Sequence, residues 1–182
     1  MLFPEKEIPL KDGRTAILRS PTREDAQALV DYMVQTAGET DFLLRTPAEC
    51  TMTAESEAAF LQSICDSPDS VMILCTVDGV LAGNCQITRM NRLKTRHRGS
   101  VAIALLKEYW SLGIGTALFS EMIAIAEDWG LKQLELEYIE GNDRARRLYE
   151  KMGFHTTGAL PNAIRLADGT MLKEFQMVRN ME

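Results

Sequence analysis

The residues best suited to holding a charged ligand are Gly113 and Gly115, which lie between a short apolar run and an apolar-periodic helix. The run, residues 101–106, is rich in Val, Ile and Leu, which predicts a strand buried on both faces. A strand that leads through a glycine loop into a helix exposes backbone N–H groups and the positive end of the helix dipole. Residues 100–115 therefore predict an anion-binding site.

Two nucleotide-binding motifs can be excluded at this loop. A dinucleotide fingerprint requires a third glycine where Leu118 stands, and a P-loop requires a lysine that does not follow Gly115. A Gly-x-Gly after a strand can also serve only as a tight turn. The loop alone therefore does not identify the anion.

A second group of residues, Asn142, Ala145 and Tyr149, recurs at helical spacing. Asn142 and Tyr149 are seven residues apart, so they share one helix face with Ala145 between them. Residues 142–154 read N-x-x-A-x-x-L-Y-x-x-x-G-F and lie one helix and one strand after the glycine loop.

Together, the two segments resemble the GCN5-related N-acetyltransferase (GNAT) superfamily. Its motif A is usually Arg/Gln-x-x-Gly-x-Gly/Ala, and its second motif is matched by residues 142–154 at every fixed position. Trp110 stands where motif A usually has Arg or Gln. The resemblance rests on residues 101–154, and the first hundred residues agree only in the order of their elements.

The resemblance implies an α/β fold: a GNAT-like mixed, mostly antiparallel sheet flanked by helices on both faces, within one N-acetyltransferase domain over residues 1–182. It implies acetyl-CoA as the acetyl donor and direct attack by a primary amine of a small molecule or amino-acid derivative. The alternatives are acetylation of protein N-termini, as by ribosomal-protein acetyltransferases, and a non-catalytic acetyl-CoA-binding sensor. The residues expected to contact acetyl-CoA are Leu105, Leu106, Ser111, Leu112, Gly113, Ile114, Gly115, Thr116, Asn142 and Ala145.

The resemblance also assigns catalytic roles. Tyr149 occupies the general-acid position, and a phenol with a pKa of about 10 is a proton donor at neutral pH. A main-chain amide near Leu105 or Leu106 is expected to stabilise the oxyanion that develops during acyl transfer.

The base that deprotonates the amine has three candidates. The strand before the glycine loop carries no carboxylate, but Glu137 stands five residues before Asn142, where similar ribosomal-protein alanine acetyltransferases place a glutamate. Near-apolar surroundings would raise its pKa toward a useful value. Alternatively, Glu137 shares a solvated strand face with Glu135, or the base is a water chain that ends on backbone carbonyls.

The acceptor pocket is implied to lie between the first two helices, their connection and the last hairpin. Glu39, Asp41 and Glu49 could attract an ammonium group, with Phe42 beside them, and residues 161–163 would close the pocket. Charged loop residues are also commonly just solvated. A peptide acceptor needs an open groove, whereas a small amine prefers an enclosed pocket.

The composition narrows the partners. The net charge is −6 and no basic stripe is interleaved with aromatics, which argues against nucleic acid and is compatible with a cationic substrate. No apolar run approaches the roughly 20 residues of a membrane span and no signal peptide is visible, so we expect a cytoplasmic protein. A homodimer is compatible with this pattern. The four cysteines include no C-x-x-C pair, so we expect reduced thiols and no metal.

The remaining pattern predicts the elements that position these residues. A capping-box pattern at Thr22 and Asp25 starts a helix that Gly38 ends, and Thr53 opens a second helix after an irregular connection. Further helices are predicted over 115–129 and 142–152. Strands are predicted over 14–19, 71–77, 80–87, 101–106, 133–139, 154–159 and 171–178, the last two joined by a loop containing Pro161. Ligands of such sheets bind at the carboxyl edge of neighbouring strands.

Overall fold

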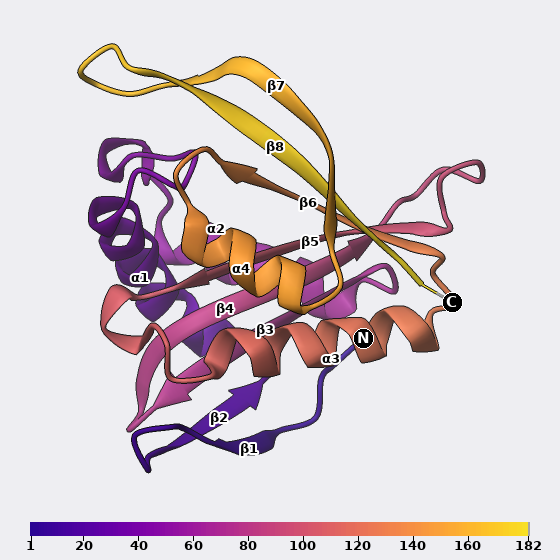
Figure 1. The fold of residues 1–182 in the computed structure, drawn as a ribbon. Helices are drawn as coiled ribbons and strands as arrows, with labels where there is room; N and C mark the ends of the chain where they lie inside the picture. Colours follow the sequence, from indigo (N-terminus) through magenta and orange to yellow (C-terminus); the bar gives the residue numbers. More distant parts are fainter. Residues whose placement is uncertain (182) are drawn as a thin grey trace.

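Apolar residues recur along the chain at the spacings typical of strands and helices. The chain folds into one eight-stranded sheet with helices on both faces (Figure 1). The computed structural model describes residues 1–181. The strands are β1 (Lys6–Pro9), β2 (Thr15–Arg19), β3 (Ser70–Val77), β4 (Val80–Arg89), β5 (Arg98–Leu105), β6 (Gln133–Ile139), β7 (His155–Arg165) and β8 (Met171–Asn180). The longer helices are α1 (Ala26–Glu39), α2 (Ala54–Asp66), α3 (Ile114–Asp128) and α4 (Asp143–Lys151).

The strand order is β1-β2-β3-β4-β5-β6-β8-β7, and only the pair β5/β6 is parallel. In Figure 1, α1 and α2 lie behind the sheet, whereas α3 and α4 lie in front of it. The predicted fold, a mixed and mostly antiparallel sheet flanked by helices on both faces, is confirmed.

The parallel pair β5/β6 is joined at one end only. Its pairing is confined to Arg98–Ser100 against Gln133–Glu135, although β5 runs on to Leu105 and β6 to Ile139. Gly99 leaves room for a side chain that packs on the sheet beside this junction, since a Cβ there would lie 2.7 Å from a Leu131 methyl group. The Arg98 guanidinium also pairs with the buried Glu135 carboxylate across the junction. Beyond it, β5 stays with β4 and β6 stays with β8.

Local signals account for the helix boundaries near this junction. Asn142 caps α4 by accepting a hydrogen bond from the Ala145 amide at 3.2 Å. Thr53 likewise accepts from the Ser56 amide at the start of α2. Gly130, at φ 65°, follows α3. Within residues 1–181, no helix combines the length and apolar character needed to cross a bilayer.

Two expectations about the elements were wrong, and one strand was not predicted. Strand 101–106 is not buried on both faces: Ala102 is exposed and residues 103–105 are half-buried, because this part of β5 has no neighbour on one side. Pro161 lies within β7 rather than in a loop, at a register shift between Leu160 and Ile164. The strand that was not predicted is β1.

Candidate active site

A cavity of about 820 Å³ opens where β5 and β6 separate. Its walls come from α1 and the α1–α2 connection, from the free side of β5, from β6 and β8, and from the loop between β5 and α3. It brings together Leu105, Gly113, Asn142, Ala145 and Tyr149, which belong to both predicted motifs. The separation of two strands therefore creates the space that the motifs were predicted to surround.

The free edge of β5 presents backbone groups to this cavity. Leu106 donates its amide to the Ala82 carbonyl at 2.9 Å, on the β4 side. Because backbone groups alternate in direction along an antiparallel strand, the amides of Ile103 and Leu105 point the other way, into the gap. Of the two amides expected to serve an oxyanion, the one at Leu106 is therefore occupied, and the one at Leu105 faces the cavity.

The loop between β5 and α3 has the backbone of an anion site. Ser111 and Gly113 have positive φ values of 67° and 103°, and α3 begins at once with Ile114. Ser111, Gly113, Gly115 and Thr116 line the cavity. Unpaired N–H groups at the start of a 15-residue helix favour negative charge here.

Besides Leu106, two more residues predicted to contact the cofactor, Leu112 and Ile114, do not line the cavity. The Leu112 carbonyl accepts a hydrogen bond from the Lys11 amide at 3.1 Å. The Ile114 side chain is completely buried in the core. Both residues therefore anchor the loop on the side that faces away from the cavity.

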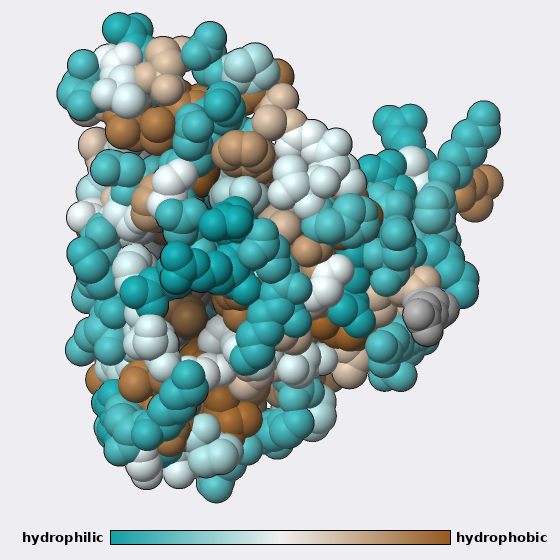
Figure 2. Space-filling view, in the orientation of Figure 1, coloured by the Kyte–Doolittle hydropathy of each residue, from teal (hydrophilic) through white to brown (hydrophobic). Residues whose placement is uncertain are grey.

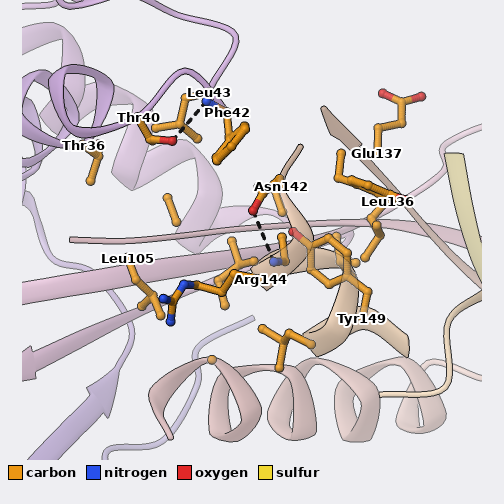
Figure 3. A pocket seen from close by; sticks show the side chains of 18 of the residues that line it. Thr36, Thr40, Phe42, Leu43, Leu105, Leu136, Glu137, Asn142, Arg144 and Tyr149 are labelled. Atoms are coloured by element: carbon orange, nitrogen blue, oxygen red, sulfur yellow. Dashed lines mark hydrogen bonds between the residues drawn. The ribbon is translucent and has the colours of Figure 1, made fainter. Parts of the chain in front are cut away.

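Tyr149 lies at the centre of an aromatic cluster on the cavity wall. Its ring centroid is 5.4 Å from that of Phe119, 6.3 Å from Tyr138 and 6.4 Å from Phe154, and only 7% of the residue is exposed. Burial raises the pKa of its hydroxyl to about 12. No residue within 1–181 makes a hydrogen bond with this hydroxyl, which lies on the side of Asn142 in Figure 3. The cluster thus fixes a protonated, unpartnered donor at the cavity.

Glu137 lines the cavity from β6, opposite Gln176 of β8. Burial raises the pKa of its carboxyl, and the nearby charges of Glu174 and Glu135 raise it further. Figure 3 shows its carboxylate directed away from Tyr149. A base at this position would reach an amine beside Tyr149 through water rather than directly.

The α1–α2 connection, which was predicted to build the acceptor pocket, does line the cavity, but of the residues singled out on it for a substrate role only Phe42 does so. Its ring lies 3.6 Å from the position that a Cβ on Gly141 would occupy, so it reaches across to the β6–α4 turn. Glu39 instead accepts a hydrogen bond from the Lys107 amide at 2.7 Å, which ties α1 to the loop after β5. Asp41 does not line the cavity.

The two outer segments predicted for that pocket also lie outside the cavity lining. Glu49 accepts from Thr46 in a capping box, and residues 161–163 belong to β7. Both have local structural roles, so neither is part of the cavity described here.

Several lining residues had not been singled out from the sequence. Tyr32 donates its hydroxyl to the Ala104 carbonyl at 2.7 Å and lies 3.2 Å from Asn84 Oδ1. Asn84 and Gln86 interrupt the otherwise apolar stretch 80–87, and that interruption was the signal that could have found them. Arg144 also lines the cavity, in a variable position of the second motif.

Comparison with known proteins agrees with this geometry. The family model described as "Acetyltransferase (GNAT) family" matches residues 27–154. The L-amino acid N-acetyltransferase AaaT of Escherichia coli (strain K12) is 24% identical over 125 residues, which are 68% of this chain and 76% of that protein. An uncharacterized N-acetyltransferase of Mycobacterium tuberculosis (strain ATCC 25618 / H37Rv) is 30% identical over 103 residues, 57% of this chain and 64% of that protein.

Solved structures of other acetyltransferases share this fold. A GNAT-family acetyltransferase from Streptococcus pneumoniae superposes with a TM-score of 0.86 at 28% identity, covering 91% of this chain and 99% of that one. YncA from Salmonella typhimurium, solved with its cofactor acetyl-CoA, has a TM-score of 0.79 at 16% identity and covers 92% of this chain and 94% of that one.

The backbone conformation of Gly113 predicts how a methyl group added at this position affects acetyl-CoA binding. Gly113→Ala should weaken the binding of acetyl-CoA at least tenfold, because φ 103° is a backbone conformation that suits glycine and the loop amides would turn away. Isothermal titration calorimetry and the thermal shift on adding acetyl-CoA measure the effect.

Gly169→Ala is the matched control. Gly169 has φ 90°, and neither its Cβ position nor that of Gly113 has an atom within 4 Å, so both variants should lose about 1–2 kcal/mol of stability. Only Gly113→Ala should lose affinity. Equal affinity in the two variants would contradict an anion site at this loop.

Proposed function

This chain belongs to the acetyltransferase (GNAT) family, and from that membership we propose that it moves the acetyl group of acetyl-CoA to the primary amine of a small molecule or amino-acid derivative. It is an N-acetyltransferase, and acetyl-CoA is its acetyl donor. The observation that carries the proposal is the cavity between β5 and β6, where a free strand edge, the glycine loop before α3 and Tyr149 meet.

The residues present fit acetyl-CoA, which supplies the acetyl group as a reactive thioester. An extended chain can add to the free edge of β5 as a strand would, with the amides of Ile103 and Leu105 as donors. Ser111, Gly113 and the start of α3 then receive the anionic end of the molecule. This arrangement would bring the thioester to the part of the cavity beside Tyr149.

Two groups of this chain are then placed to assist the transfer. One of the two β5 amides, that of Leu105 or that of Ile103, can donate to the oxygen on which negative charge develops, while the other holds the extended chain. The Tyr149 hydroxyl keeps its proton through neutral pH because its pKa is raised to about 12, so it can give that proton to the departing sulfur. Glu137 would accept the proton of the amine through water.

A contact between two walls of the cavity favours a small acceptor over a peptide. Phe42 extends from the α1–α2 connection toward Gly141, which brings these two walls together at this point. The name of the E. coli relative, L-amino acid N-acetyltransferase, supports the same class of acceptor. We therefore expect an amino-acid-sized amine.

An acceptor screen tests this proposal. Release of free CoA thiol from acetyl-CoA is followed with amino acids and their derivatives, polyamines, and peptides with free N-termini. The proposal expects amine-dependent release with small acceptors. Transfer to peptides alone would indicate a protein N-terminal acetyltransferase, and tight binding of acetyl-CoA without transfer to any amine would indicate a sensor.

Replacing Tyr149 by Phe isolates its hydroxyl. Tyr149→Phe should lower turnover about 10²-fold while the KM for acetyl-CoA stays within a few-fold, because the acid acts in the transition state. Stability should change little, since the hydroxyl makes no hydrogen bond within residues 1–181 that would be lost.

Tyr109→Phe is the control, because Tyr109 is equally buried but lies outside the cavity lining. Its turnover should match that of the wild type. Full activity in Tyr149→Phe would mean that the thiolate departs without this proton, and the acid role would be withdrawn.

Replacing Glu174 and replacing Glu137 should change the pH–rate profile in different ways. A base works only when deprotonated, so activity falls as pH drops through its pKa, and burial and Glu174 raise that pKa for Glu137. Glu174→Gln should therefore move the acidic limb to lower pH and preserve the rate at neutral pH. Glu137→Gln should lower the neutral rate and flatten the acidic limb, with acetyl-CoA affinity nearly intact.

Glu140→Gln serves as the control, since Glu140 pairs with Lys173 and does not line the cavity. Its profile should not change. An unchanged profile in Glu137→Gln would remove Glu137 as the base and leave a water chain in that role.

A further inference from the structure

The loop before α3 contains a tryptophan that is tied to the open edge of β5. Trp110 donates its indole Nε1–H to the Leu105 carbonyl at 2.9 Å. Like the Leu105 amide, this carbonyl points away from β4 and into the gap. Trp110 therefore donates to a backbone carbonyl that has no partner strand on this side of β5. This hydrogen bond holds the indole ring at the loop end of the cavity.

Arg144 lies against this ring. Its guanidinium carbon is 4.7 Å from the Trp110 ring centroid, and its Nη1 donates to Ser111 Oγ at 2.6 Å. Figure 3 shows the side chain extending from α4 toward Leu105. A planar cation held over an aromatic face and bonded at one edge has its orientation restricted while its other N–H groups stay available.

Arg144 differs from the other arginines of α4. Arg146 pairs with Asp143 and Glu150, whereas no carboxylate of residues 1–181 lies within 4.0 Å of Arg144. Arg147 also has no such partner, but it does not line the cavity. The outer surface of α4 forms a hydrophilic band in Figure 2, and of its three arginines only Arg144 combines a free charge with a place on the cavity wall.

The position of this free cation matches the anion site. Arg144 bonds Ser111, which shares the loop with Gly113, and the amino end of α3 follows directly. A guanidinium beside a helix N-terminus, in a protein of net charge −6, suits a ligand with adjacent phosphate groups. Fixed orientation matters because the guanidinium fork matches phosphate oxygens two at a time.

We propose that Arg144 binds the diphosphate of acetyl-CoA, and that Trp110 is the positioning residue that holds Arg144 beside the loop. This inference rests on the proposed function, since it assumes acetyl-CoA as the ligand. It adds a cofactor-binding residue on α4, outside the glycine loop, and gives the tryptophan of that loop a role.

A series of acyl donors tests the role of Arg144. Arg144→Gln should weaken acetyl-CoA binding about tenfold, the effect of losing a charge-assisted hydrogen bond. The same fold-change is expected for S-acetyl-dephospho-CoA, which keeps the diphosphate and lacks the 3′-phosphate. The KM for S-acetylpantetheine, which has neither, should not change. Arg147→Gln removes the same charge from the same helix and should leave all three values as in the wild type.

The other outcomes overturn the assignment. An effect that disappears with S-acetyl-dephospho-CoA would place Arg144 at the 3′-phosphate, and an equal effect on S-acetylpantetheine would make it structural. Unchanged acetyl-CoA affinity in Arg144→Gln would remove it from the site. These results differ from failure of the proposed function, in which the wild type itself neither binds acetyl-CoA nor transfers its acetyl group.

A double-mutant cycle tests the role of Trp110. Trp110→Phe keeps a ring but removes the bond to Leu105, so it should weaken acetyl-CoA binding several-fold in the wild type and have little further effect in Arg144→Gln. Trp129→Phe leaves Trp110 as the one tryptophan, whose fluorescence should change on acetyl-CoA binding. Additive losses, or fluorescence that does not respond, would contradict the positioning role.

Discussion

The separation of β5 from β6 is the constraint on which the rest of the structure depends. The two strands are held together by three residue pairs, by close packing at Gly99 and by the ion pair between Arg98 and Glu135. Beyond Ser100 each strand follows its other neighbour, and backbone donors and acceptors are left facing a gap. Unpaired backbone groups are costly when buried, so the gap must be open to solvent or filled by a ligand.

The elements around the gap meet that requirement in different ways. Trp110 satisfies the carbonyl of Leu105 from the loop side, and the adjacent helix α3 points its amino end at the same space. Helix α4 packs its tyrosine against Phe119 of α3 and Phe154, so the hydroxyl of Tyr149 is positioned by core packing rather than by a hydrogen bond. A group held in this way keeps its hydrogen-bonding capacity for a ligand.

Short-range patterns in the sequence were sufficient for much of this arrangement. The cap at Asn142, the spacing to Tyr149 and the glycine loop depend on neighbours a few residues apart, and all three segments line one cavity. What could not be predicted depends on distant contacts. Glu39 has the charge expected of an acceptor site, but its carboxylate accepts a hydrogen bond from the amide of Lys107, which is 68 residues away in the sequence.

The length of the β5–β6 pairing was equally out of reach of the sequence. An apolar run such as 101–106 looks the same whether the strand has two neighbours or one. The partner strands decide how many neighbours β5 has, because β6 pairs along its full length with β8 while β5 pairs with β4. The predicted full burial of β5 was wrong for this reason, and the half-exposed edge that replaces it is the part of the strand that contacts the cavity.

Charge is distributed along the cavity in a way that suits two substrates of opposite sign. Lys11 and Arg144 lie at the loop end, beside the amino end of α3, whereas Glu137 and Glu174 lie on β6 and β8 and have no ion-pair partner among residues 1–181. A donor with an anionic tail is attracted to the first end and an amine to the second. Since surface charges act over about 8–10 Å at physiological salt, each attraction is local. The charges along the cavity therefore match the anionic donor and the amine acceptor of the proposed reaction.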